Sequence, residues 1–310
     1  MHTKHNKQLL LNEPGRRKFI LTATRLASAA VLLNSPLMSF AGKLSVGSNA
    51  ITVGEIMDAF IREVPGAPFP KTVDTLKAGN RDIVVTGIVT AMFATLEVIQ
   101  KTIALGANFI IAHEPTFYNH LDETNWLEND EVYRYKADLL QKHQIAIWRN
   151  HDYIHTHIPD GVESAVVARL GWTKYYSTGD GIALLPGISL KALIQHAKDK
   201  LGITTVRYIG DLQQSCKKIL LMPGASGGKN QIESMMKRKP DVLVCGEIQE
   251  WETAEYVRDS QTKGQKLSLV VLGHIASEEP GSEYMADWIN KKIPAIKVTH
   301  VPANNSLSFL

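Results

Sequence analysis

Residues 95–114, TLEVIQKTIALGANFIIAHE, contain the unit that decides the fold. Leu96, Ile99 and Ile103 recur at helical spacing, and Gly106 is typical of the residue that ends a helix. The apolar run NFIIA follows and stops at His113. Uninterrupted apolar runs are typical of parallel strands that are covered on both faces of the sheet. The segment therefore predicts a helix and then a buried strand that ends at an ionisable side chain.

The same alternation of helix and strand continues along the chain. Strands are expected at 82–89, 108–112, 145–148, 218–222, 241–245 and 267–272, and helices at 95–105, 131–143, 163–170, 190–201, 230–239 and 253–261. This pattern predicts an α/β fold with two similar lobes, at about 50–171 and 216–310, each a mostly parallel or mixed sheet flanked by helices. The segment 172–215 is less regular, and we expect it to be an inserted or capping region.

Composition excludes several classes of protein. The chain has 310 residues, of which 44% are hydrophobic and 21% charged, so it can bury a core and is not intrinsically disordered. Two cysteines are too few for a disulfide scaffold or a cysteine-rich zinc module. Cys216 precedes one predicted strand and Cys245 ends its parallel neighbour, so we expect them to lie too far apart for a disulfide bond and to be free.

The N-terminal segment predicts export. Residues 1–41 hold six of the 34 basic residues and one of the 31 acidic ones, so the net charge of +3 belongs to this segment and does not indicate nucleic-acid binding. RRKFI at 16–20, an apolar stretch of about 13 residues and SFA at 39–41 are typical of a twin-arginine export signal that is cleaved near Ala41. The stretch is shorter than the ~20 residues of a spanning helix, although a retained anchor is the alternative. We expect a periplasmic protein without a stable membrane span.

Ionisable residues gather where three predicted strands end. His113 and Glu114 follow one strand, HDYIHTH at 151–157 follows the next, and His274 with Glu278 follows the last. Ligands of open α/β sheets bind outside the carboxyl ends of the strands. We therefore expect a metal site there, between the two lobes. Nitrogen and oxygen donors without thiolates suit Zn, Mn, Fe, Ni or Co better than Ca or Mg.

From about Ile51 onward the chain resembles the GTP cyclohydrolase I type 2 family, the Nif-three-like dinuclear metal-centre proteins. Four motifs in the family's order carry the resemblance: ATLEVIQKTIALGANFIIAHEP, HDYIHTHIPDGVESAVVARLGW, PGASGG followed by DVLVCGEI, and GHIASE. The resemblance implies a homohexamer and a centre of two divalent transition-metal ions. It also implies the opening of a nucleotide's purine ring in some members, which does not suit an exported protein because GTP is scarce outside the cytoplasm.

Two of the implied metal ligands depart from the family pattern. The first motif usually carries two adjacent histidines, where this chain has His113 and Glu114, and the second usually carries an aspartate, where this chain has His155. His274 and Glu278 match the last motif. The two departures offset each other, because three histidines and two carboxylates are kept. The alternative is that one exchanged residue does not bind, which leaves a site for a single ion.

Other polar residues near these motifs are expected to assist. We assign proton transfer, ligand orientation or substrate binding to His151, Asp152 and His157. Glu247 matches the family's Gly-Glu step and is expected to orient a ligand or contact substrate, whereas His120 either reaches the site or lies on the surface. The glycine-rich loop 223–228 either cradles a phosphate or forms a tight turn between strand and helix.

These expectations together favour a metal-dependent hydrolase that acts on a small molecule of unknown identity. Two adjacent metal ions acidify a bridging water and polarise an electrophilic oxygen beside it, which serves the hydrolysis of amide, amidine or phosphate bonds. The alternative is a metal-binding or metal-handling protein without turnover. A sugar-isomerase-like barrel is a weaker alternative, because it needs eight strand–helix units and only about six are visible.

Overall fold

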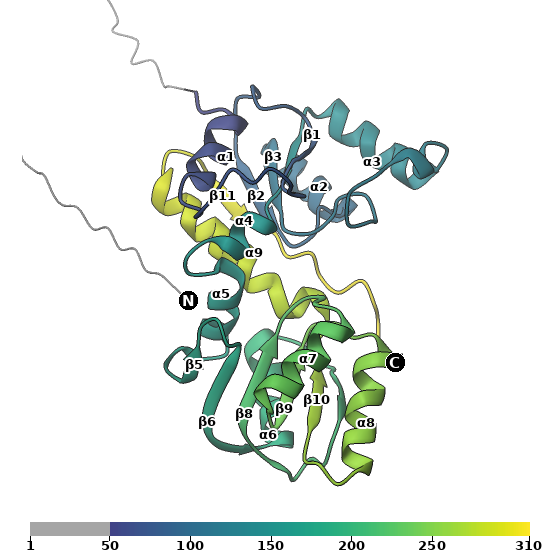
Figure 1. Ribbon diagram of the computed structural model, residues 1–310. Helices are drawn as coiled ribbons and strands as arrows, with labels where there is room; N and C mark the ends of the chain where they lie inside the picture. Colours follow the sequence, from purple (N-terminus) through teal and green to yellow (C-terminus); the bar gives the residue numbers. More distant parts are fainter. Residues whose placement is uncertain (1–49) are drawn as a thin grey trace, which may run out of the picture. The chain divides into compact units, whose positions relative to one another are not determined.

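The computed structural model describes residues 50–310, which form two β-sheets flanked by helices (Figure 1). The export signal expected at 1–41 lies outside the described residues. Among the residues that are described, no helix combines the length and the apolar character needed to cross a membrane. The mixed α/β architecture with two sheets confirms the predicted fold class.

The first sheet has the strand order β1-β4-β3-β2-β11, and only β1 runs antiparallel to its neighbour. Its strands are β1 (Leu76–Ala78), β2 (Ile88–Ala91), β3 (Phe109–Ala112), β4 (Ala146–Arg149) and β11 (Val298–His300). Every residue of β2, β3 and β4 is buried, as the uninterrupted apolar runs predicted. Because β2, β3 and β4 are parallel, their carboxyl ends lie at the same edge of the sheet.

Helices cover both faces of this sheet. Helices α2 (Leu96–Ala104) and α3 (Glu131–Lys142) pack on one face, where Ile99 and Leu140 meet Ile110 and Ile147. On the other face, α1 (Val53–Ile61) and α9 (His274–Lys292) pack against alternate residues of the same strands. Thr95 caps α2, and Gly106 follows it with a φ of +67°, as the sequence indicated.

The second sheet has the strand order β5-β6-β8-β9-β10-β7. Its strands are β5 (Tyr176–Ser177), β6 (Ile182–Ser189), β7 (Arg207–Ile209), β8 (Ser215–Met222), β9 (Val242–Cys245) and β10 (Ser268–Val271). Strands β8, β9 and β10 are parallel, while β6 and β7 run antiparallel at either side. Helix α6 (Leu190–Leu201) packs on one face, and α7 (Gly228–Arg238) and α8 (Glu255–Thr262) pack on the other.

The structure differs from the sequence-based expectation in three segments. Strand β11, which lies in the range expected for the second lobe, joins the first sheet. The segment 172–215 is more regular than its sequence indicated, because β5, β6 and β7 all join the second sheet. The strand expected at 82–89 begins only at Ile88, since backbone groups before it are bound elsewhere. Thr86 N–H donates to the Asn108 side chain, which in turn donates to the Val84 carbonyl.

The two cysteines lie as predicted. Cys216 and Cys245 are both buried and free. Cys245 pairs in register with Met222, at the far end of β8 from Cys216. Burial raises the pKa of the Cys245 thiol to about 12, so it is an unreactive core residue.

Candidate metal centre

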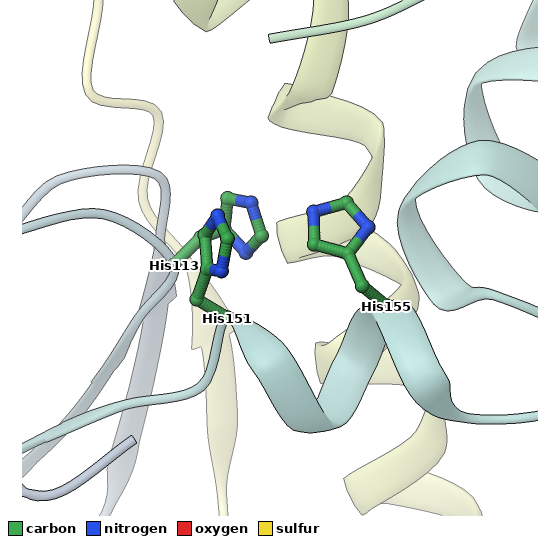
Figure 2. Close-up of side chains that lie close together, drawn as sticks. All are labelled: His113, His151 and His155. Atoms are coloured by element: carbon green, nitrogen blue, oxygen red, sulfur yellow. The ribbon is translucent and has the colours of Figure 1, made fainter. Parts of the chain in front are cut away.

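Strand ends from both sheets deliver the candidate donors to one place. His113 and Glu114 follow β3, and His151 stands at the start of α4 (Asp152–Thr156), just after β4. His274 begins α9, and Glu278 lies one helical turn later, so the side chains of this pair share a face. The last turn of α4 carries His155, whose ring points toward those of His113 and His151 (Figure 2).

Three imidazoles form the first donor group. One nitrogen each from His113, His151 and His155 lies within 4.8 Å of the other two. The rings of His113 and His151 are nearly parallel, with 4.8 Å between their centroids, and the ring of His155 is edge-on to both. The sequence analysis left proton transfer, ligand orientation and substrate binding open for His151, whereas the structure places it among the candidate metal ligands.

The second donor group combines His113 with two carboxylates. Donor atoms of His113, Glu114 and Glu278 lie within 4.8 Å of one another, and all three residues are buried. His274 Nε2 completes this group, 3.2 Å from Glu114 Oε1 and 3.0 Å from Glu278 Oε2. The five residues predicted as metal ligands therefore lie together, and His113 belongs to both groups.

His113 itself presents a nitrogen suited to a cation. Its Nδ1 is 3.3 Å from the Asn150 carbonyl, to which it can donate, while Nε2 is buried and makes no hydrogen bond within the described chain. Nε2 lies 3.6 Å from Glu278 Oε2. A buried ring nitrogen left facing a carboxylate fits a site for a positive ion between them.

The charges of the centre favour a cation there. Burial raises the pKa of Glu278, but this effect is outweighed by its contacts with His113 and His274, so its pKa lies well below the usual range. Burial lowers the pKa of His274, yet contacts with Glu114, Glu247 and Glu278 raise it to about 12. These carboxylates therefore attract positive charge to the centre, as a divalent metal ion would supply.

His151 has the opposite tendency. Burial, and then the neighbouring His113 and His155, lower the pKa of His151 to about 4. The ring is therefore neutral at physiological pH, which is the form in which imidazole binds a metal ion. Its Nδ1 faces Asp152 Oδ1 at 3.0 Å, so Nε2 is the nitrogen directed toward Glu114. Asp152 thus orients His151, and the Thr72 hydroxyl donates a hydrogen bond to the second oxygen of Asp152.

Two more carboxylates orient imidazoles in the same way. His155 Nδ1 lies 3.0 Å from Asp160 Oδ2, and His274 Nδ1 lies 2.9 Å from Glu247 Oε1. Such partners fix the tautomer of a metal-binding histidine and leave Nε2 for the ion. Glu247 lies where it can orient His274, which is one of the two roles expected from the sequence. Asp160 was not predicted, although its place as the cap of α5 (Gly161–Arg169) is visible in the IPDG segment.

Asp74 was also missed. This buried carboxylate accepts the backbone N–H groups of His151, Asp152 and Tyr153 at 2.7–3.0 Å, and so caps the start of α4. Its loop lies far from α4 in the sequence, and no local pattern marks it as a cap.

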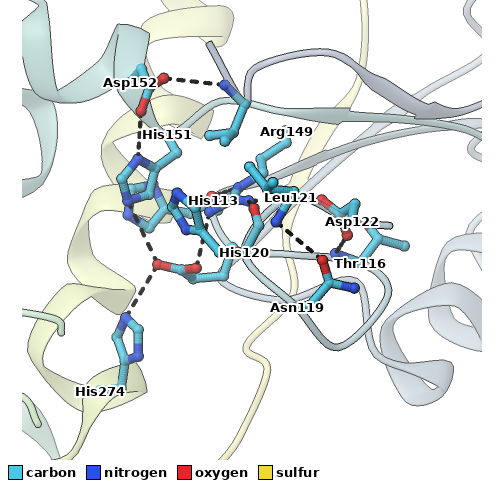
Figure 3. Close-up of polar contacts among 12 residues, drawn as sticks. His113, Thr116, Asn119, His120, Leu121, Asp122, Arg149, His151, Asp152 and His274 are labelled. Atoms are coloured by element: carbon cyan, nitrogen blue, oxygen red, sulfur yellow. Dashed lines mark hydrogen bonds and ion pairs between the residues drawn. The ribbon is translucent and has the colours of Figure 1, made fainter. Parts of the chain in front are cut away.

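Arg149 anchors the loop that carries His113 and Glu114 (Figure 3). The arginine is fully buried. Its Nη2 lies 3.4 Å from Glu114 Oε2, its Nη1 lies 3.7 Å from Asp122 Oδ2, and its Nε donates to the His113 carbonyl at 3.3 Å. Asp122 in turn pairs with Lys77 at 3.3 Å. The buried guanidinium therefore offsets the negative charge of the Glu114 carboxylate.

Two residues considered from the sequence lie away from the donor groups. His157 stacks on Phe60 with 5.4 Å between the ring centroids, and its Nε2 is 3.8 Å from Glu63. It points away from the donors because it follows the last turn of α4, so the structure gives no support to a catalytic role. His120 is exposed, and its ring lies 6.3 Å from that of His151, at the rim of the centre.

The glycine-rich loop is a tight turn against a donor. Gly224 has a φ of +65°, and a Cβ at this position would come within 2.2 Å of Glu278 Oε1. Its N–H donates to Ser277 Oγ at 3.0 Å, and its carbonyl accepts the N–H of Glu247. The loop thus supports Glu278 and Glu247, which favours the turn over the phosphate cradle.

The comparisons with known proteins identify the family. The Duf34/NIF3 (NGG1p interacting factor 3) family model matches residues 73–306, a range that includes every candidate donor. This chain belongs to the Duf34/NIF3 family. A GTP cyclohydrolase 1 type 2 homolog from Clostridium perfringens is 26% identical to this Duf34/NIF3 chain over 216 residues, which are 66% of this chain and 78% of the relative. The family resemblance inferred from the four motifs is therefore confirmed.

Solved structures share the fold of this Duf34/NIF3 protein. The Bacillus cereus protein related to NIF3 is 17% identical with a TM-score of 0.68, covering 85% of this chain and 100% of that one. Staphylococcus aureus protein SA1388 is 19% identical with a TM-score of 0.67, covering 84% and 99%. At these identities the likeness concerns the fold alone.

Proposed function

We propose that the protein is a metal-dependent hydrolase whose centre holds two divalent transition-metal ions. One observation carries the proposal: nitrogen and carboxylate donors from the strand ends of both sheets surround the buried Nε2 of His113. The donor set lacks thiolates and suits Zn, Mn, Fe, Ni or Co.

The two donor groups suggest how the ions would be held. His113, His151 and His155 form one set, and Glu114, Glu278 and the neighbouring His274 form a second set that shares His113. When bound, the metal ions would acidify a water and polarise the bond to be cleaved. The chain's own contribution is orientation: Asp152, Asp160 and Glu247 hold the imidazoles of His151, His155 and His274, respectively.

Metal content and hydrolysis, measured together, test this function. His274→Ala and Glu278→Ala should each lose at least one metal equivalent by elemental analysis while the circular dichroism spectrum stays unchanged. His143→Ala, on an exposed residue at the end of α3, is the matched control and should keep its metal. The wild-type protein with metal should hydrolyse a member of a panel of esters, amides and phosphoesters.

Two results would count against the proposal in different ways. If either variant retains two ions per chain, the assignment of the His274–Glu278 motif is wrong. If the protein binds metal but cleaves no member of the panel, the non-catalytic metal-handling alternative is favoured instead.

We further propose that the chain is exported to the periplasm and assembles as a homohexamer. The first part rests on the RRKFI segment and the second on the family resemblance alone. Native mass spectrometry checks the assembly, and a monomeric mass would contradict it.

A further inference from the structure

A pocket of about 260 Å³ opens beside the metal centre, and His155 and Glu278 form part of its wall. The start of α5, the turn at 179–181, the end of β8 and one side of α7 form the rest. Ligand pockets usually enclose about 300–1,000 Å³. A ligand enclosed here is therefore small, and one of its ends lies against the candidate metal ligands.

One basic side chain lines the pocket together with the donors. Arg238 is the one lysine or arginine among the described residues that line the pocket. Its Nε donates to the Asp180 carbonyl at 2.5 Å, which fixes the guanidinium at the turn and leaves its terminal N–H groups for a ligand. Ser226 adds a hydroxyl that is buried and has no partner within the described chain. The planar fork of an arginine matches a carboxylate in a bidentate pair.

The remaining charges limit how negative the ligand can be. Asp160, Glu163 and Asp180 also line the pocket. A nucleoside triphosphate, with about four negative charges, would meet a single arginine and would be repelled by these carboxylates. No Phe, Tyr or Trp of the described residues lines the pocket, so a purine ring would find no aromatic face to stack on.

We propose that this pocket is the substrate subsite and that the substrate is a small amide or ester with one carboxylate, which Arg238 binds. The inference rests on the hydrolase function proposed above. In the reaction the oxygen of water bonds to the carbonyl carbon and the C–N or C–O bond breaks. One proton of that water passes to the leaving amine or alkoxide. This chemistry differs from the GTP chemistry in the name of the clostridial relative, because the described lining of the pocket offers a single basic side chain and no Phe, Tyr or Trp.

Paired probes test the subsite without knowledge of the natural substrate. N-acetylglycine carries the carboxylate, N-acetylglycinamide lacks it, and GTP and inorganic phosphate are the competing anions. In NMR titrations of the metal-loaded protein, N-acetylglycine should bind at least ~10-fold more tightly than the amide, since a charge-assisted pair with the arginine is stronger than a hydrogen bond to a neutral amide. Arg238→Gln should abolish this preference. Lys237→Gln, on the exposed neighbour in α7, should preserve it.

The variant also separates the subsite from the metal ions, which attract carboxylates themselves. A preference for the acid that persists in Arg238→Gln would overturn the inference, as would equal affinities in the wild type or tighter binding of GTP or phosphate. Arg238→Lys keeps the charge and should retain part of the preference, which excludes a general loss of fold. Binding that depends on Arg238 without any hydrolysis would preserve the subsite and contradict the proposed activity.

Discussion

Arg149 determines which oxygen of Glu114 faces the centre. It holds Oε2 at 3.4 Å, so that Oε1 is directed toward His274 and His151. The same guanidinium binds the backbone of His113 and therefore positions two successive donors. Removing one partner of a buried ion pair costs about 3–5 kcal/mol, because the other charge is left without compensation.

Substitution of Arg149 should therefore weaken metal binding beyond its effect on stability. We expect Arg149→Met to lower metal affinity about 10–100-fold, the usual effect of losing a residue that orients a ligand. Lys77→Met is the matched control, because it removes a buried cation from Asp122 without touching Glu114. Competition with a chelator measures affinity, and urea unfolding measures stability. Equal losses of affinity in both variants would show that Arg149 acts only through stability.

Individual residues were predictable from the sequence when their own chemistry marked them. His113, Glu114 and His274 stand directly after or close to apolar runs, and their side chains are common metal ligands. Arg149 and Asp74 carry no such mark. Their roles depend on which backbone and carboxylate groups the fold brings beside them, and a single sequence does not show those neighbours.

At the scale of elements, α4 is the part of the centre that depends most on its surroundings. It spans only Asp152–Thr156, and helices this short are not stable alone in water. Asp74 accepts three N–H groups at its start and places a negative charge at the positive end of the helix. This cap therefore fixes the positions of His151 and His155.

Loss of this cap should affect both stability and metal binding. We expect Asp74→Asn to lower the free energy of unfolding by about 1–3 kcal/mol and to weaken metal binding, because the amide keeps one acceptor oxygen of two. Asp130→Asn removes the capping carboxylate of α3, which is remote from the donors, and should leave metal affinity unchanged. Unfolding in urea and chelator competition provide the two measurements. Unchanged affinity in Asp74→Asn would contradict the role given to α4.

Elements were predictable where helical periodicity or an apolar run was long. Helices α2 and α3 fall within one residue of their expected ranges, and β3, β4 and β9 do likewise. Strands β5 and β7 were missed because they are short and form the two edges of the second sheet. Their residues are partly exposed and therefore show no continuous apolar run.

For the molecule as a whole, the proposed export leads to a testable prediction about residues 16–20. Arg16→Lys together with Arg17→Lys should retain the protein in the cytoplasm, because the paired arginines mark the twin-arginine route. Arg25→Lys makes the same exchange outside the pair and should leave export unchanged. Immunoblots of periplasmic and cytoplasmic fractions measure the distribution. Export of the doubly substituted chain would refute this route.

Helix α9 and strand β11 also set when the centre can form. His274 and Glu278 begin α9, which packs against α5 and β2, and β11 then pairs with β2 in the first sheet. During translation, His113 and Glu114 are synthesised some 160 residues before His274 and Glu278. The earlier donors are therefore present before the first sheet is complete. The donor group that includes Glu278 is therefore complete only after α9 has left the ribosome. Under the function proposed above, the supply of metal at that moment would decide which ion this group receives.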